Sequence, residues 1–347
     1  MTRFEAQAYH LVFRFAAGTS RGVLTNKHGW IIRLTDVHNP LKTGVGECSL
    51  IPGLSPENTS DLEARMAQLT GEAADFRHIV HDLREAFPSL AFAVETALLD
   101  LENGGKMRLF PSAFVEGKQG IPINGLIWMG EIEEMKERFA EKIKEGYTTI
   151  KLKVGALNFD DELALLKGIR NEYSPADLSL RLDANGAFAP HEALEKLKRL
   201  SEFHIHSIEQ PIKPGQPEQM SELCQKSPVP IALDEELIGV RDHQMFSLLN
   251  GIRPQYIILK PSLLGGLSRS REWMDTAESL GIGWWVTSAL ESNIGLNAIA
   301  QWTASLNTTI PQGLGTGQLY HNNFASPLYI SRAQLWHNPD VAWSLPL

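Results

Sequence analysis

The segment Leu180-Arg181-Leu182-Asp183-Ala184-Asn185-Gly186 is a short apolar strand that ends in an acid and a turn. After Ile121 the same succession of strand, polar turn and amphipathic helix recurs, which is typical of a parallel sheet. Successive strand ends lie from 25 residues apart (Glu209 to Asp234) to 30 apart (Lys153 to Asp183). Eight such units predict an α/β barrel of the (β/α)8 type; a doubly wound sheet is the alternative. The expected strand ends are Asn124, Lys153, Asp183, Glu209, Asp234, Lys260, Ser288 and Gly315.

The first hundred residues have a different pattern, which predicts a mixed α+β domain. Tyr9–Phe15 and Gly29–Leu34 are rich in strand-forming residues, and Gly18–Leu24 between them resembles a hairpin loop. Between Glu57 and Asn103 apolar residues recur at helical spacing. We therefore expect an α+β domain over residues 1–115, a barrel over 116–321, and a tail, 322–347, that folds back onto the first domain.

Composition excludes several classes of protein. The net charge of −9 argues against a nucleic-acid partner, since phosphate binding needs clustered Lys and Arg. Two cysteines, Cys48 and Cys224, are too few for a disulfide framework or a thiolate zinc site. The N-terminus lacks a signal-peptide pattern and no apolar stretch reaches the ~20 residues of a spanning helix. We expect a cytoplasmic protein without a membrane partner, and the sequence makes no prediction about oligomeric state.

Three consecutive strand ends carry carboxylates: Asp183, Glu209 and Asp234. Barrel enzymes build their sites at the C-terminal ends of the strands, so these side chains should meet at one mouth. Crowded carboxylates repel one another unless a cation lies among them, and oxygen-only ligands suit Mg²⁺ or Mn²⁺ better than zinc. The alternative is that each acid only caps the helix that follows it.

Lysines flank the three acids. Lys151 and Lys153 project from the same face of one strand, because side chains alternate, and Lys260 ends the strand after Asp234. A lysine beside a second ammonium and a divalent cation has its charged form disfavoured, so it can act as a base near neutral pH. The metal would hold a substrate carboxylate and stabilise the enediolate left by proton removal. The alternative is a solvated pair of surface lysines.

This order of residues resembles the enolase superfamily and, within it, the muconate-lactonizing subgroup. That pattern places Lys-x-Lys on the second strand, Asp, Glu and Asp on the third to fifth, and Lys on the sixth. Here it reads Lys151-Leu152-Lys153, Asp183, Glu209, Asp234 and Lys260. The resemblance implies an α+β capping domain over a (β/α)7β TIM-like barrel. It also implies one catalytic Mg²⁺, with Mn²⁺ as a possible substitute.

The stretch Thr287-Ser288-Ala289-Leu290-Glu291-Ser292-Asn293-Ile294-Gly295 resembles the o-succinylbenzoate synthase family within this subgroup. Dipeptide epimerases tend to carry Asp-x-Asp at the eighth strand, where this chain has Gly315-Thr316-Gly317. The resemblance implies a lyase acting on a small carboxylate, which dehydrates 2-succinyl-6-hydroxy-2,4-cyclohexadiene-1-carboxylate to 2-succinylbenzoate on the route to menaquinone. Lys153 would move the proton, and Lys260 would lie on the opposite face of the ring.

Auxiliary positions follow from the same resemblance. Ser288 and nearby backbone would receive the succinyl end, although Ser288 could instead bond its own backbone. Glu235 would hydrogen-bond or pair with a lysine, and the loop containing Arg21, with Leu50–Leu54, would close over the site. The auxiliary set is Lys151, Asn185, Glu235, Ser288, Arg21 and Gly315.

Two other functions fit the same residues. An N-acylamino acid racemase or dipeptide epimerase would use Lys153 and Lys260 as bases on opposite faces. A non-catalytic barrel that only binds a ligand is the alternative from another class, but a binding protein needs no paired bases.

Overall fold

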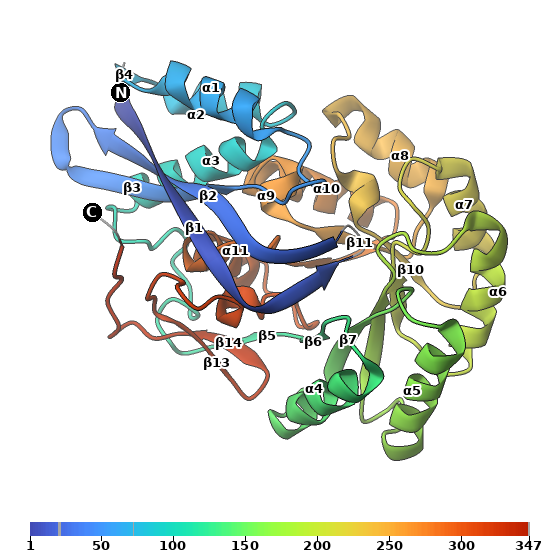
Figure 1. Cartoon of the computed structure of the whole chain (residues 1–347). Helices are drawn as coiled ribbons and strands as arrows, with labels where there is room; N and C mark the ends of the chain where they lie inside the picture. Colours follow the sequence, from blue (N-terminus) through green and yellow to red (C-terminus); the bar gives the residue numbers. More distant parts are fainter. Residues whose placement is uncertain (20–21, 72, 346–347) are drawn as a thin grey trace.

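The computed structural model describes residues 1–19, 22–71 and 73–345 of the chain. Its N-terminal part is an antiparallel sheet in the order β3-β2-β1-β4, with helices packed on one face (Figure 1). Gly44 and Gly46 let α3 approach this sheet, because a Cβ atom on either would lie about 2 Å from a backbone oxygen of α3. The elements are β1 (Thr2–Thr19), β2 (Gly22–Asp36), β3 (Asn39–Ser49), α1 (Thr59–Leu69), β4 (Ala73–Ala74), α2 (Phe76–Leu83) and α3 (Pro88–Glu102).

The second part is a parallel sheet of seven strands in the order β12-β11-β10-β9-β8-β7-β6. Its strands are β6 (Gly125–Ile127), β7 (Thr149–Lys153), β8 (Ser179–Asp183), β9 (Ser207–Glu209), β10 (Ile231–Leu233), β11 (Tyr256–Leu259) and β12 (Gly283–Val286). The main helices are α4 (Ile132–Lys144), α5 (Phe159–Glu172), α6 (Pro190–Ser201), α7 (Pro217–Lys226), α8 (Met245–Ile252), α10 (Leu267–Ser279) and α11 (Asn293–Ser305). Shorter turns of helix are η1 (Glu235–Leu237), η2 (Asp242–Gln244), α9 (Pro261–Leu264) and η3 (Thr316–Gln318).

A short segment around Gln312 closes the sheet into a barrel. Gln312 forms a parallel bridge with Ile123, and the neighbouring Gly313 forms one with Thr287 beyond β12. The Gln312 side chain also accepts a 2.7 Å hydrogen bond from the Val286 amide. This segment takes the eighth position, and the only helical element after it in the described part of the chain is the short turn η3, with no α-helix, so the expected (β/α)7β barrel is confirmed.

Two predictions about local structure are wrong. The first barrel strand begins after Asn124 instead of ending there, because the apolar run is shared between two sheets: β5 (Ile121–Pro122) pairs outside the barrel. The expected loop Gly18–Leu24 is mostly strand, since the β1–β2 pairing resumes after a bulge and joins Gly18 to Val23. Arg21 lies outside the described residues.

The C-terminal tail contacts both parts of the molecule. Strands β13 (Leu328–Ser331) and β14 (Gln334–His337) form a hairpin that pairs with β5 (Figure 1). Asn322 bonds the backbone of β1 at 2.8 Å and 3.0 Å, and Trp343 packs with Ile31. The predicted domain boundaries at residues 115 and 321 stay a prediction. Among the described residues, none forms a helix with the length and apolar character needed to cross a bilayer.

Candidate active site

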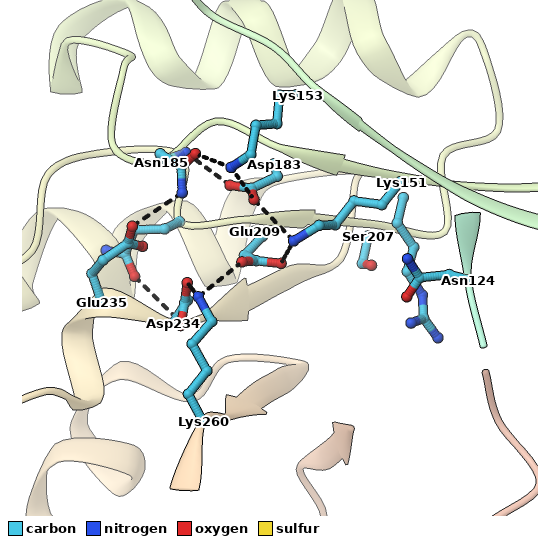
Figure 2. Close-up of polar contacts among 12 residues, drawn as sticks. Asn124, Lys151, Lys153, Asp183, Asn185, Ser207, Glu209, Asp234, Glu235 and Lys260 are labelled. Carbon is cyan, nitrogen blue, oxygen red and sulfur yellow. Dashed lines mark hydrogen bonds and ion pairs between the residues drawn. The ribbon is translucent and has the colours of Figure 1, made fainter. Parts of the chain in front are cut away.

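The charged strand ends meet at one mouth of the barrel. Lys153 is in register with Asp183, and Asp183 with Glu209, so the three side chains face the same side of the sheet. Asp234 and Lys260 follow β10 and β11 directly. Figure 2 shows the carboxylates between Lys153 on one side and Lys260 on the other.

Ammonium and carboxylate groups alternate along this rim. Lys151 Nζ lies 2.9 Å from Asp183 Oδ2 and 3.0 Å from Glu209 Oε2, and Lys153 Nζ lies 3.0 Å from the same Asp183 oxygen. Lys260 pairs closely with Asp234 and lies 3.9 Å from Glu209 Oε1. The three carboxylates are at most 2% exposed. Three buried carboxyl groups thus lie among three lysines, and burial raises the pKa of one of them, Asp234.

The alternative in which the acids only cap helices is not what the structure has. Helix α6 begins after Ala189 and α7 after Gln216, both well beyond the acids at the ends of β8 and β9. Asp234 precedes η1 but makes no capping hydrogen bond with its side chain. The carboxylates are directed into the rim instead.

The carboxylate oxygens of the three acids are ligands of the kind that a hard divalent cation prefers. All three groups offer oxygen, and the buried Glu209 Oε1 has no hydrogen-bond partner among the described residues. As the side chains stand, however, no group of three or more His, Cys, Asp or Glu residues in the described part of the chain encloses a metal position. Lys151 and Lys260 lie between the acids. Metal binding by Asp183, Glu209 and Asp234 therefore stays a prediction.

A cavity of about 400 Å³ lies above the rim. Its floor is polar, and its cover is apolar, from the N-terminal domain. The segment Leu50–Leu54 contributes Ile51, Pro52 and Leu54, as expected for a covering segment, and β2 contributes Leu24. Of the predicted site residues, those lining this cavity are Lys151, Lys153, Asp183, Asn185, Glu235, Lys260, Ser288 and Gly315.

Comparison with known proteins places the chain. Residues 134–335 match the enolase C-terminal domain-like family. The o-succinylbenzoate synthase of Desulfotalea psychrophila is 51% identical, over 92% of this chain and 95% of that protein. The chain belongs to the o-succinylbenzoate synthase family. The crystal structure of MenC from D. psychrophila superposes on this family member with a TM-score of 0.86 at 44% identity, covering 96% of this chain and 99% of that one.

More distant relatives share the fold of this o-succinylbenzoate synthase family member. The muconate lactonizing enzyme from Pseudomonas fluorescens has a TM-score of 0.83 at 23% identity, covering 99% of this chain and 96% of that one. The N-succinylamino acid racemase of Amycolatopsis is 26% identical over 70% of this chain and 65% of that protein. The expected superfamily and the expected lyase class are confirmed.

The rim carboxylates shift the pKa values of two of the lysines. In this family member burial disfavours the Lys151 ammonium, but Asp183 and Glu209 outweigh that effect and raise its pKa. Burial likewise opposes the Lys260 charge, and Asp234 and Glu209 raise its pKa overall. Both lysines therefore favour the ammonium form, because the nearby carboxylates outweigh burial.

Asn185 organises the predicted base in this family member. Its Oδ1 accepts a 2.5 Å hydrogen bond from Lys153 Nζ, and its Nδ2 donates at 3.1 Å to Glu235 Oε1. Glu235 is thereby linked to Lys153 through Asn185. The Ser288 hydroxyl is bonded to the Thr316 hydroxyl at 2.5 Å across the barrel closure, and not to its own backbone.

Sequence analysis missed a second buried charge cluster beside the cavity. Lys27 on β2 is 3% exposed, and Glu47 on β3 is 1% exposed. Both contact the loop after β12. The available signal was a lysine on the strand face that it shares with the buried Gly29 and Ile31.

Proposed function

We propose that this protein is an o-succinylbenzoate synthase, which dehydrates 2-succinyl-6-hydroxy-2,4-cyclohexadiene-1-carboxylate to 2-succinylbenzoate in menaquinone biosynthesis. The observation that carries the proposal is the pair Lys153 and Lys260, which approach one cavity from opposite sides of a carboxylate rim (Figure 2). The 51% identity to a relative with this name supports the substrate.

Lys153 is the proposed acid–base residue. Its neutral amine takes the proton next to the substrate carboxylate, and the ring C–O bond then breaks on the same face. The new Lys153 ammonium returns the proton to the departing hydroxide, so water leaves and the ring becomes aromatic. Asp183 and Asn185 hold Nζ from two directions, at 3.0 Å and 2.5 Å, which fixes it for both transfers.

Lys260 and Lys151 supply positive charge in this mechanism. Lys260 keeps its proton, since Asp234 and Glu209 raise its pKa, and its ammonium faces the anionic ring from the side opposite Lys153. Lys151 also stays protonated, because Asp183 and Glu209 raise its pKa, and it adds a second positive charge beside Lys153. Asp183, Glu209 and Asp234 would hold Mg²⁺ or Mn²⁺, which would stabilise negative charge on the substrate carboxylate.

A racemase or epimerase acting on N-acylamino acids or dipeptides is the second candidate. The specific observation in its favour is that two lysines face one cavity, which is what removal of a proton from one face and return to the other requires. The same two lysines argue against a barrel that only binds a ligand.

The test compares both reactions in one preparation. Purified protein with Mg²⁺ is incubated in D₂O with the cyclohexadiene substrate and, separately, with N-succinylamino acids. Product is followed by the absorbance of the aromatic ring, and exchange at the α-carbon by NMR. We expect efficient dehydration with weak exchange, and no dehydration by Lys153→Ala. Fast racemisation with negligible dehydration would assign the second candidate instead.

A further inference from the structure

The loop after β12 forms one wall of the cavity through Ser288, Ala289 and Leu290. Leu290 has a φ of 61°, in the left-handed region that residues with a Cβ atom rarely adopt. Such a conformation persists only where the surrounding contacts impose it. The contacts that impose it come from the N-terminal domain as well as from the barrel.

Lys27 holds the loop from the side of the N-terminal sheet. Its Nζ donates hydrogen bonds of 2.6 Å to the backbone oxygens of both Ala289 and Leu290. Tyr320 donates a third hydrogen bond, of 2.7 Å, to the Leu290 oxygen. Charge-assisted hydrogen bonds to a buried ammonium are stronger than neutral ones, so both carbonyl groups are fixed in direction.

Glu291 holds the same loop from within the barrel. Its side chain is fully buried and accepts a 2.8 Å hydrogen bond from the Ala289 amide. The other carboxylate oxygen accepts a hydrogen bond from the Ser262 hydroxyl, two residues beyond Lys260. Burial lowers the pKa of Lys27, and the nearby Glu291 carboxylate opposes that shift. The loop is therefore tied both to the strand end that carries Lys260 and to the N-terminal sheet.

Glu47 completes the arrangement at the start of α11. Its two oxygens accept 2.8 Å hydrogen bonds from the backbone amides of Ser292 and Gly295, and further hydrogen bonds from the hydroxyls of Ser292 and Tyr9. A carboxylate is favoured at a helix N-terminus by the free amides there. Three of the residues that resemble the family pattern, Glu291, Ser292 and Gly295, thus serve this contact between the two parts of the chain.

We propose that Lys27, Glu47 and Glu291, here called the loop clamp, position the cavity wall Ser288–Leu290 against the part of the substrate remote from the reacting carbons. The N-terminal domain then shapes the substrate pocket through a buried ionic contact, in addition to covering it. Lys27 is a positioning residue, since it touches backbone that lines the cavity. The inference rests on the proposed dehydration and names the residues that set its substrate recognition.

The layout of the site indicates that the clamped wall meets the end of the substrate away from Lys153. Lys153 and its partners are on β7 and β8, whereas the clamped wall follows β12. Loosening this wall should weaken the binding of substrate and transition state to a similar degree and leave proton transfer at Lys153 in place. A mutation of this kind raises KM with little change in kcat.

The experiment compares Lys27→Met with a control at a second junction between the two parts of the chain. Arg84, at the end of α2, pairs with Asp242 and, at 2.9 Å, with Glu272, and none of the three lines the cavity. Both Lys27→Met and Arg84→Met remove a cation from a contact with the barrel. For each purified holoenzyme, KM, kcat, the melting temperature and Mn²⁺ affinity are measured.

We expect Lys27→Met to raise KM for the cyclohexadiene substrate by about tenfold or more while kcat and Mn²⁺ affinity stay near wild type. Arg84→Met should lower the melting temperature and leave KM unchanged. A wild-type KM in Lys27→Met, or an equal rise in both variants, overturns the proposal. If Lys27→Met does not fold, the isosteric Glu291→Gln replaces it under the same criteria. A wild-type enzyme without dehydratase activity would refute the proposed function separately, and the same KM comparison would then use an N-succinylamino acid.

Discussion

Asn185 Oδ1 lies 2.5 Å from the Nζ atom of Lys153, on the side away from Lys151. Asn185 also has a φ of 42°, so its backbone is in the left-handed region that asparagine tolerates better than most residues. The backbone N–H of Asn185 donates a 3.1 Å hydrogen bond to Asp183 Oδ1, which connects this turn to the rim. The position of the predicted base therefore depends on a neutral amide that touches both Lys153 and Glu235.

Asn185→Ala should lower kcat for dehydration by about tenfold or more, since Lys153 loses one of its two orienting partners. KM should change little, because the substrate is held elsewhere. Steady-state kinetics on the cyclohexadiene substrate checks this. A variant with unchanged kcat would show that Asp183 alone orients the amine.

Lys153→Ala should reduce kcat by about 10² to 10⁴, which is the usual contribution of a general acid–base group. The carboxylates remain, so Mn²⁺ affinity measured by electron paramagnetic resonance should be retained. Lys144→Ala, at an exposed position of α4, is the matched control and should behave as wild type. Substantial turnover by the Lys153 variant would remove it from the mechanism.

Chelation of divalent metal should abolish dehydration, and Mg²⁺ or Mn²⁺ should restore it. Asp234→Asn should raise the metal concentration needed for half-maximal activity by about 10- to 100-fold, since one anionic oxygen ligand is lost and Lys260 loses its main partner. Titration of activity against metal gives the value. Equal metal dependence in the variant and wild type would exclude Asp234 as a ligand.

The partly buried His206 should make stability depend on pH. Burial, with a smaller effect of Arg181, lowers its pKa from 6.5 to about 4. The unfolded chain therefore binds more protons between these two values, and stability is lost as pH falls through that window. Because the ring is partly exposed, the loss should be about 1 to 2 kcal/mol. Urea unfolding at about pH 7 and about pH 5 should show a smaller loss for His206→Asn than for wild type.

Gly295→Ala should destabilise the fold by about 1 to 3 kcal/mol, since overpacking a buried site forces neighbours to move. An added Cβ would lie 2.8 Å from Cβ and Cγ of Glu291 and 3.0 Å from Glu47 Oε2. Gly168→Ala within α5 meets nothing within 4 Å and should instead be neutral or slightly stabilising. Thermal unfolding of both variants checks the contrast, and equal effects would contradict it.

The predictions from sequence were right where the signal was local. Lys153, Asp183 and Glu209 each end a short apolar run at regular spacing, so the parallel strands and the shared mouth could be inferred from single segments. The start of β6 could not be inferred in this way. Ile121 pairs with β14, more than 200 residues away, and so belongs to another sheet. Lys27 was missed for the same reason: its acceptor Ala289 is 262 residues away.

The lysine pKa values could not be predicted from residue order. The sequence places Lys151 and Lys153 on one face but does not say how closely Asp183 and Glu209 approach them. At 2.9 Å and 3.0 Å from Lys151, the carboxylates outweigh burial. The direction of the pKa shift depends on the distances between these side chains, which only the folded chain determines.

The alternation of charges along the rim has a consequence for how the protein matures. Lys151 and Lys260 already form ion pairs with the acids around Glu209. Because these lysines act as counter-ions, folding of the chain does not require a bound metal ion. A divalent cation that bound to these acids would have to displace a lysine ammonium that is already paired with them. Metal loading would then be an exchange reaction, and its rate would depend on how readily the Lys151 and Lys260 side chains move away.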